Sequence, residues 1–465
     1  MRAVTTHVNI FVAILTLGPF SLPSPADTAY YVAPTGSDSN PGTIVAPFAT
    51  FRKAQSAMRA SSIKTTYVRA GKYFPTGFDT GGGDTAIVKL TSADSGETWS
   101  YYPFDGVASA IIDGGSNSTT IGIKWGFWLE GVSNVTINGL QLQHFANEFL
   151  HATGSASGTM FINNTLHDNY NWRNYAGIAL WGSAQNSTVA NNHVYNTVTH
   201  GILASTCSGS CAAGIKGVII KNNFVYNTCT ISTDCGAIYL QDYASPRSTN
   251  ITISNNFIRD VNPKGDNGGR GIYLDDGTSN VMATGNIVSG HKNTCFNIHG
   301  GDNDIFSGNI CDEQSSGHES IVRYETSSEV PSSLMTGNAF TNNIIIAGSR
   351  DGGNGYTGDG VPNPLTIKDN AYFNYVGLTI DSTGGSAGTD INPISEDPHL
   401  STWCYAIEAG SPVYNGPVFF PGVVGGWGQP GFVIPSIGTP PSSPHITGCG
   451  SRALVPTLPY RPGIE

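Results

Sequence analysis

Charged residues are scarce in this chain of 465 residues. Asp, Glu, Lys and Arg together make up 12% of it, against about 25% in an average globular domain. The 22 Lys and Arg are scattered along the sequence, and the formal net charge is −11. Nucleic-acid binding needs a basic surface that neutralises phosphates, so the composition argues against a nucleic-acid partner. An acidic surface also repels polyanions at long range, which favours a neutral ligand.

Long apolar runs are also missing. After the run at residues 8–17, no segment approaches the roughly 18 apolar residues that cross a bilayer, so we expect no membrane association. That run follows Arg2 and precedes the small residues Ser24 and Ala26, which is the pattern of a secretory signal peptide. The sequence therefore predicts a signal peptide over residues 1–26 and a secreted protein, extracellular or periplasmic.

Cysteine is sparse but suits export, because an exported chain meets an oxidising compartment. Of the eight cysteines, Cys229 and Cys235 flank a five-residue loop, and Cys207 and Cys211 lie closer still. We expect local disulfides at these two pairs.

In place of charged residues the chain is rich in glycine, with 58 residues, and in asparagine. These residues belong to a repeated sequence pattern. Short segments that alternate apolar and polar residues are followed by an Asn-Asn, Gly-Asn or similar pair and then by another apolar run. The steps between successive pairs are 23 to 33 residues. The pairs end at Gly139, Asn164, Asn192, Asn223, Asn256, Asn286, Asn309, Asn338 and Asn370.

Such steps suit one coil of a parallel β-helix, in which short strands alternate with turns. Asn suits the turns because it tolerates the left-handed backbone conformation, and stacked Asn side chains can hydrogen-bond as a ladder. The segments 218–226 and 251–259 show the same strand, turn and strand 33 residues apart. The sequence thus predicts an all-β fold, a parallel β-helix.

The two ends of the repeat resemble a known group of proteins. Residues 29–58 resemble the opening of secreted right-handed parallel β-helix proteins of the pectate-lyase-like superfamily, in which a helix caps the barrel. Here Phe48, Phe51, Ala54 and Met58 would form the apolar face of that cap. The segments 396–400 and 406–412 resemble the sequence segments that close such β-helices at their C-terminal end. The resemblance implies one carbohydrate-active β-helix domain over residues 27–415, and residues 416–465 read as a tail rich in Pro and Gly.

Aligning the central coils predicts which side chains point inward. Two apolar stacks would fill the core: Ile178, Ile202, Ile238, Ile272 and Phe296, and two residues further on Leu180, Ala204, Leu240, Leu274 and Ile298. The alternation of a strand then sends the intervening residues outward. One outward row would hold Ala179, Leu203, Tyr239, Tyr273 and Asn297, and a second would hold Trp181, Ser205, Gln241, Asp275, His299 and Arg323.

These rows predict a glycan-binding groove centred on residues 270–277, because aromatic rings stack on sugar faces while amides and charged groups bind hydroxyls. His200 and Arg270 would join the groove from the positions that precede the strands. The residues that we expect to bind a polysaccharide or oligosaccharide are Trp181, His200, Tyr239, Gln241, Arg270, Tyr273, His299 and Arg323.

Asp275, Asp276 and Asp242 are the expected catalytic residues. Coils stack about 4.8 Å apart, so carboxylates on adjacent coils approach the separation used by retaining glycosidases. Asp242 and Asp276 would occupy one column on adjacent coils beside Asp275, and Asp234 is a reserve candidate. The segment 271–277 also resembles segments of β-helix glycoside hydrolases in which an Asp carries catalysis. We therefore expect an extracellular glycoside hydrolase that acts as a monomer without a cofactor or metal.

Two other functions stay open. A polysaccharide lyase would use His200, Tyr273 or His299 as base and Arg270 as carboxylate clamp, with Ca²⁺ held by the aspartates. The rows lack the Lys that lyases of this superfamily commonly show, which weighs against a lyase. A non-catalytic adhesive β-helix would need the aromatic rows but no coupled carboxylates.

Overall fold

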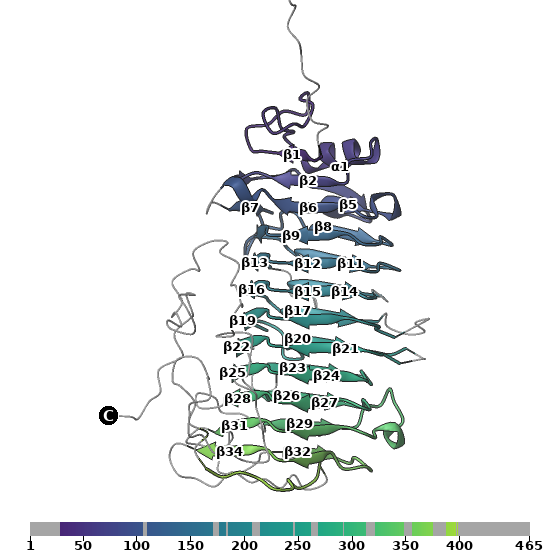
Figure 1. Ribbon diagram of the computed structural model, residues 1–465, viewed down its shortest axis with the longest axis vertical. Helices are drawn as coiled ribbons and strands as arrows, with labels where there is room; N and C mark the ends of the chain where they lie inside the picture. Colours follow the sequence, from purple (N-terminus) through teal and green to yellow (C-terminus); the bar gives the residue numbers. More distant parts are fainter. Residues whose placement is uncertain are drawn as a thin grey trace, which may run out of the picture.

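The computed structural model describes residues 28–105, 109–170, 176–182, 185–206, 214–244, 247–261, 268–291, 293–312, 321–347, 356–374, 387–396 and 398. Strands stack coil upon coil along one axis into an elongated right-handed parallel β-helix (Figure 1). The predicted fold is confirmed. The predicted signal peptide, the predicted closing segment 406–412 and the tail at 416–465 lie outside the described residues.

Three long sheets run along the axis, and all but one of their strand pairs are parallel. The first sheet contains β1 (Tyr30–Val32), β2 (Thr65–Val68), β6 (Thr98–Tyr101), β9 (Thr136–Asn138), β12 (Met160–Ile162), β15 (Thr188–Ala190), β18 (Ile219–Lys221), β21 (Ile251–Ser254), β24 (Val281–Thr284), β27 (Ile305–Ser307), β30 (Ala339–Thr341) and β33 (Thr366–Lys368). The second contains β3 (Gly71–Tyr73), β7 (Ala110–Asp113), β10 (Gln141–Gln143), β13 (Thr165–His167), β16 (His193–Tyr195), β19 (Phe224–Thr228), β22 (Phe257–Val261), β25 (Ile287–His291), β28 (Ile310–Asp312), β31 (Ile344–Ala347) and β34 (Ala371–Asn374). The third contains β4 (Phe78–Gly81), β5 (Asp84–Leu90), β8 (Trp125–Glu130), β11 (Leu150–Thr153), β14 (Ile178–Trp181), β17 (Ile202–Ser205), β20 (Gly236–Gln241), β23 (Arg270–Asp275), β26 (Phe296–His299), β29 (Val322–Glu325) and β32 (Tyr356–Asp359).

Among the described residues one α-helix, α1 (Phe51–Arg59), closes the N-terminal end of the barrel, as predicted, although Phe48, expected on its apolar face, precedes it. The Thr50 hydroxyl caps it by accepting a hydrogen bond from the Lys53 amide. Phe51, Ala54 and Met58 are buried against the first coils. The helix thus covers a core end that would otherwise be open to water. Short 3₁₀ turns lie at Ser92–Asp94, Pro103–Asp105 and Ser332–Leu334.

Buried asparagines form a ladder at the corner between the first and second sheets. Asn223 shows the pattern: its backbone amide and its Nδ2 both donate to Oδ1 of Asn256 at 2.9 Å, and Nδ2 also donates to the Val189 carbonyl. The members are Asn164, Asn192, Asn223, Asn256, Asn286, Asn309, Asn343 and Asn370. At the C-terminal end Asn370 Nδ2 donates to the Asp390 carboxylate at 2.8 Å. The predicted ladder is confirmed, but Gly139 is not a member: it is a left-handed turn residue (φ 71°), and the Leu140 amide donates to Asn164 Oδ1 in its place.

The two residues of each Asn pair have different tasks. The first adopts the left-handed conformation, as in Asn222 (φ 55°) and Asn255 (φ 54°), and turns the chain. The second is buried and makes the ladder. This division explains why Gly can replace the first member but not the second.

The assignment of Asn338 to this ladder was wrong. Asn309 is followed by Asn343, whereas Asn338 lies at the corner between the third and first sheets, where its Oδ1 accepts from the Asp304 amide at 2.8 Å. That corner also uses left-handed residues, among them Gly337 (φ 73°). A Gly-Asn pair therefore occurs at two corners, and the sequence pattern alone does not separate them.

Two disulfides lie within the described residues. Cys229–Cys235 closes the predicted five-residue loop, which confirms that pairing, and Cys295–Cys311 joins two parts of one coil. The predicted pair Cys207 and Cys211 lies outside the described residues. No helix among the described residues is long and apolar enough to cross a membrane.

Removing one rung of the ladder tests how much it contributes. In Asn256→Ala, two donors of Asn223 and the Ile220 carbonyl lose their partners inside the barrel. Buried groups left unpaired cost about 1–3 kcal/mol each. We expect the free energy of unfolding to fall by at least about 3 kcal/mol in urea denaturation. Thr252→Ala, outward on the same coil, is the control, and an equal loss in both variants would contradict the ladder's role.

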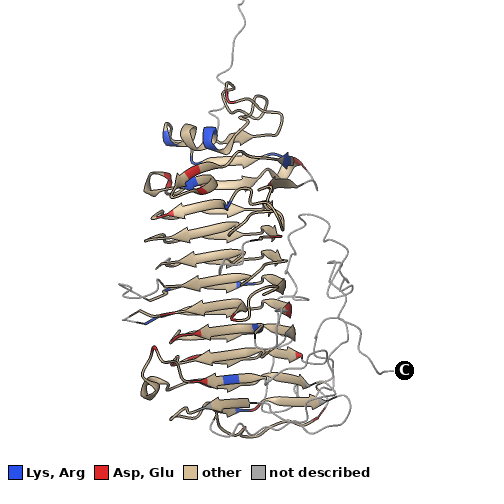
Figure 2. Ribbon diagram, turned by 180° about the vertical axis from the view of Figure 1, so that it is seen from behind, with Lys and Arg blue, Asp and Glu red and all other residues tan. Residues whose placement is uncertain are grey.

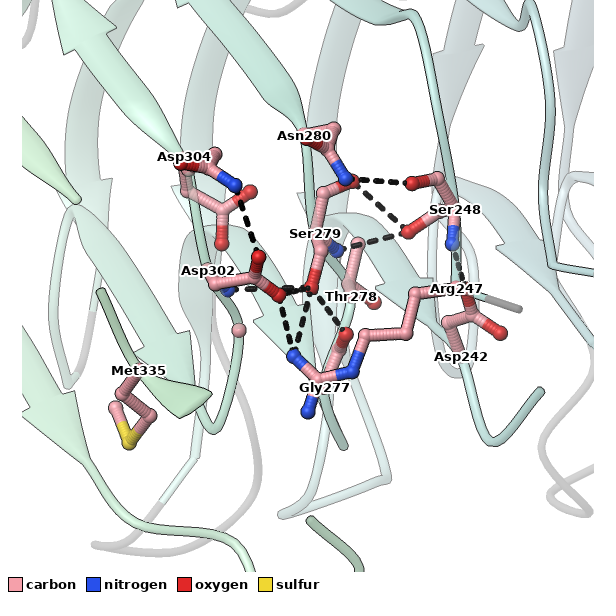
Figure 3. Close-up of polar contacts among 12 residues, drawn as sticks. Asp242, Arg247, Ser248, Gly277, Thr278, Ser279, Asn280, Asp302, Asp304 and Met335 are labelled. Carbon is pink, nitrogen blue, oxygen red and sulfur yellow. Dashed lines mark hydrogen bonds and ion pairs between the residues drawn. The ribbon is translucent and has the colours of Figure 1, made fainter. Parts of the chain in front are cut away.

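Asp304 takes a ladder-like position at the other corner, near the polar network of Arg247 and Asp302 (Figure 3). Its Oδ1 accepts from the Val281 amide at 3.0 Å, while its buried Oδ2 has no hydrogen-bond partner among the described residues. Burial raises the pKa of Asp304 well above its usual value. The folded protein therefore favours the neutral acid at this corner.

The raised pKa makes Asp304 a source of pH-dependent destabilisation. An unfolded Asp ionises near pH 3.9, whereas the folded protein keeps its proton to higher pH, so stability falls as the pH rises above about 4. Asp304→Asn does not titrate, and Asn338 shows that an amide fits such a corner. We expect the variant to match the wild type in melting temperature near pH 4 and to exceed it increasingly towards neutral pH. A constant difference across this range would contradict the assignment.

Candidate functional site

The third sheet carries the predicted rows in the predicted register. Tyr239 pairs with Tyr273, and Gln241 pairs with Asp275. Both inward stacks are confirmed as columns of paired, buried residues: Ile178, Ile202, Ile238, Ile272 and Phe296, and Leu180, Ala204, Leu240, Leu274 and Ile298. Charged residues are sparse along the stacked coils (Figure 2).

The position of Arg323 was wrong by two residues. Arg323 pairs with Asn297 in the first row, and Glu325 pairs with His299 in the second. A shift of two residues preserves the inward and outward alternation, so the alternation could not reveal the error. Arg323 Nε donates to Glu325 Oε2 at 2.8 Å, and Asn297 Nδ2 donates to Oε1 at 3.2 Å. The face therefore contains a carboxylate that the sequence analysis missed.

Asp275 is the centre of a hydrogen-bonded cluster. Its Oδ1 lies 2.5 Å from His299 Nδ1 and accepts from the Asp276 amide at 2.9 Å, while Oδ2 accepts from the Tyr239 hydroxyl at 2.5 Å. Only 5% of its side chain is exposed. The structure thus brings together Asp275, Tyr239 and His299, which the sequence analysis had placed in two neighbouring rows.

Charge pairing sets the protonation of Asp275 and His299. Burial alone would raise the pKa of Asp275, but the hydrogen bonds from His299 and Tyr239 outweigh it and hold the pKa below its usual value. Burial would lower the pKa of His299, yet the bond to Asp275 and its charge raise it. Each of the two side chains therefore stabilises the charged form of the other.

Asp276 follows the end of β23, where the chain turns through two left-handed residues, Asp276 (φ 46°) and Gly277 (φ 86°). The turn directs its carboxylate alongside the cluster. Oδ2 accepts from Gln241 Nε2 at 2.9 Å, and Oδ1 accepts from the Ser327 hydroxyl at 3.0 Å. Its side chain is 13% exposed, so Asp276 is more open to a ligand than Asp275.

Arg270 is the first residue of β23. Its guanidinium carbon lies 4.3 Å from the centre of the Tyr273 ring. Nε donates to Asn297 Oδ1 at 2.8 Å, and NH1 lies 3.3 Å from Asp234 Oδ1. These contacts fix Arg270 on the first row and bring Asp234, the reserve candidate, to the site from the loop closed by Cys229 and Cys235.

Asp234 differs from Asp275 in its electrostatics. Partial desolvation and the negative charge of Asp275 raise the pKa of Asp234, while Arg270 acts in the opposite sense. Because 72% of its side chain is exposed, solvent moderates the desolvation. The site therefore combines two carboxyl groups whose pKa values are shifted in opposite directions, downward for Asp275 and upward for Asp234.

The structure does not bring the Asp242 carboxylate into this cluster. Asp242 occupies the expected position after β20, but its Oδ1 accepts from the Ala244 amide at 2.8 Å and its Oδ2 from the Ser248 amide at 2.6 Å. Figure 3 shows this carboxylate beside Ser248, within the turn network. The backbone amides of the turn capture the side chain, and Asp242 stabilises the turn.

The first outward row is largely covered. Tyr239 and Tyr273 are buried, together with Ala179 and Leu203, and Trp181 packs against them half-buried. His200 is buried too: its ring stacks on Tyr239 at 4.1 Å, and its Nδ1 accepts from the Gly236 amide. Burial lowers the pKa of His200 to about 4. The surface open to a ligand therefore follows the second row.

A metal ion would fit this cluster only partly. Atoms of Asp275, Asp276 and His299 lie within 4.8 Å of one another. Ca²⁺ prefers oxygen ligands throughout, whereas this set contains an imidazole whose Nδ1 already bonds Asp275. The donor set does not match the calcium site expected for a lyase.

Comparisons with known proteins agree with the fold. Residues 125–311 match a family model described as a right handed beta helix region. The GH136 lacto-N-biosidase from Eubacterium ramulus superimposes with a TM-score of 0.50 at 13% identity, over 79% of this chain and 67% of that one. The surface adhesin PfbA of Streptococcus pneumoniae gives a TM-score of 0.50 at 11% identity, over 80% of this chain and 96% of that one. Pectate lyase Pel9A gives 0.43 at 18% identity, over 72% and 79%. The curated protein sequences contain no match.

The Asp275 and His299 pair predicts a characteristic pH profile of stability. The depressed pKa of Asp275 contributes stability above about pH 4, which is lost as the pH falls through the folded value. The raised pKa of His299 contributes stability below about pH 6.5, which is lost as the pH rises through the folded value. We expect His299→Gln to lower the free energy of unfolding by about 3 kcal/mol, most strongly between these two pH values. Denaturation across the pH range measures this, and a pH-independent loss would contradict the ion pair.

Proposed function

We propose that the chain is a glycoside hydrolase whose site lies over the second row of the third sheet. The observation that carries the proposal is the pair of carboxyl environments. Hydrogen bonds keep Asp275 ionised, while the pKa of the exposed Asp234 is raised. Two carboxyl groups with opposite tendencies are the requirement of glycoside hydrolysis, which needs a proton donor and a carboxylate base or nucleophile.

The exposure of each carboxyl group to a ligand then decides its role. Asp234, exposed and with a raised pKa, donates a proton to the glycosidic oxygen as the bond to the anomeric carbon breaks. Asp276, close to Asp275 and more open, supplies the carboxylate that attacks the anomeric carbon or takes a proton from the attacking water. Asp275 is buried and holds His299 and Tyr239 in place. It is a positioning residue in this scheme, and the reaction uses no cofactor.

The remaining predicted residues have supporting roles. Gln241 donates to Asp276 and fixes its orientation. Half-buried Trp181 offers a ring face to a sugar along the second row. The charged residues meet one another in close pairs, which leaves no basic row among the described residues of this face to hold a polyanion. The proposed substrate is therefore a neutral polysaccharide or oligosaccharide, and the N-terminal sequence suggests that it is met outside the cytoplasm.

Elimination on a uronate polymer fits less well. A lyase needs an accessible base that is unprotonated before it takes the proton. His200 is buried, His299 favours its protonated form, and burial strongly raises the pKa of Tyr273. The proposed carboxylate clamp, Arg270, is already engaged by Asn297 and Asp234. These contacts favour hydrolysis.

Isosteric substitutions test the proposal. We expect Asp276→Asn and Asp234→Asn each to lower kcat at least about 100-fold on the glycan that the wild type cleaves, since acid and base catalysis typically contribute that much. The measurement is reducing-sugar release from a panel of neutral and acidic polysaccharides. Asp260→Asn is a matched control, because Asp260 is also in the left-handed conformation (φ 53°) but lies in β22 of the second sheet.

The outcomes separate the candidate functions. Reducing ends without an unsaturated product mean hydrolysis, whereas an unsaturated uronate product that absorbs in the ultraviolet means elimination. Binding to a glycan without any product favours an adhesive β-helix. Full turnover by both Asp variants would remove these residues from the mechanism.

A further inference from the structure

A second polar and aromatic cluster lies on the third sheet, towards its N-terminal end. Trp125 and Trp128 come from β8, His151 comes from β11, and Glu148 precedes β11. The ring centres of Trp125 and Trp128 lie 4.7 Å and 5.6 Å from that of His151. Glu148 Oε1 lies 3.9 Å from His151 Nδ1. In a chain this poor in charge, such a grouping needs an explanation.

The strand register puts this cluster on the same outward face as Asp275. Trp128 pairs with His151, and His151 pairs with Ala179 in the first row. The sheet order places β14, β17 and β20 between β11 and β23, so His151 lies four coils, or about 19 Å, from the row position of Tyr273. Half-buried Trp181, on the coil next to His151, lies between the two clusters.

Several polar atoms of the second cluster are buried and unsatisfied. Trp128 Nε1, Glu148 Oε2 and His151 Nδ1 have no hydrogen-bond partner among the described residues. The Glu148 side chain is 4% exposed. Buried polar groups are nearly always hydrogen-bonded, and three unpaired atoms on these neighbouring side chains point to an occupant that supplies both donors and acceptors.

The charge state of the cluster defines the chemistry of that occupant. Burial raises the pKa of Glu148 well above its usual value and lowers the pKa of His151 to about 4. Burial therefore favours the neutral form of both side chains. The adjacent Lys89, 4.7 Å from the centre of the Trp128 ring, is neutralised by Glu130 at 2.5 Å. A neutral ligand rich in hydroxyl groups suits this cluster better than an ion does.

We propose that Trp128, Glu148 and His151, with Trp125 behind them, form a second binding site for one unit of a neutral glycan. The site rests on the proposed function and deepens it. Sugar hydroxyls pair with Glu148 Oε2, His151 Nδ1 and Trp128 Nε1, while the half-buried Trp128 ring contacts the sugar face. With Trp181 between the clusters, one extended glycan contacts both ends of the face, and the substrate is a polymer.

Chain-length dependence tests the second site. Kinetics are measured on xylo-, cello-, laminari- and chito-oligosaccharides from disaccharide to octasaccharide. We expect Trp128→Ala and Glu148→Gln to lower kcat/KM roughly tenfold on the longest oligosaccharides, the effect of losing about one buried hydrogen bond, and to leave disaccharides unaffected. Trp128→Phe, which keeps a ring and loses Nε1, should lie between. Met160→Ala, exposed on the first sheet of the same coil, is the control.

Failure of the site and failure of the proposed function give different results. Equal losses at every chain length, or no loss, would overturn the second site while hydrolysis stands. If the wild type cleaves nothing, affinity electrophoresis in gels that contain xylan, β-glucan or glycol chitin tests binding alone. Retardation lost in Trp128→Ala and Glu148→Gln but kept in Met160→Ala supports the site. Retardation unchanged in all variants, or absent in the wild type, overturns it.

Discussion

The vertical register between coils is the constraint on which this molecule depends. Each buried Asn of the ladder binds the next coil with its side chain and its own backbone amide, so neighbouring coils are held in one alignment. Parallel strands then repeat that alignment around the coil. Because the register is fixed, residues about thirty positions apart in sequence become neighbours at about 4.8 Å. Both polar clusters on the third sheet are products of this stacking, and neither could arise within a single coil.

That constraint also explains what the sequence could predict. Inward stacks such as Ile238 and Ile272 follow from apolar alternation, and the Asn pairs mark one corner of each coil, so the fold and most row positions were predictable. The errors have one source. Alternation has a period of two, so it could not detect the two-residue shift that exchanged Arg323 with Glu325. A Gly-Asn pair serves two different corners, so Asn338 could not be separated from Asn343 by pattern.

Side-chain direction at strand ends was less predictable still. Asp242 and Asp276 follow equivalent strands, yet the Ala244 and Ser248 amides capture one carboxylate, while a left-handed turn directs the other to the cluster. The difference lies in the loops, whose geometry a repeat does not encode. Asp234 shows the converse. Its loop is closed by the Cys229–Cys235 disulfide, a pairing that the spacing did predict, but its approach to Arg270 depends on how that loop folds over the sheet.

The scarcity of charge gives the remaining charges their effect. On a densely charged surface, a carboxylate would be surrounded by many partners with small and opposing influences. Here burial raises the pKa of the Asp275 carboxylate, and the hydrogen bonds from His299 and Tyr239 outweigh it. Among the described residues, no ion pair of Glu148 or His151 is shorter than the 3.9 Å between them, and burial is the largest influence on the pKa of each. The same face therefore carries one cluster in which paired charges stabilise each other and, four coils away, a second in which burial favours the neutral forms. A polymer that lies along this face would contact the Glu148 and His151 cluster at one end, and at the other end the charged groups that are suited to bond cleavage.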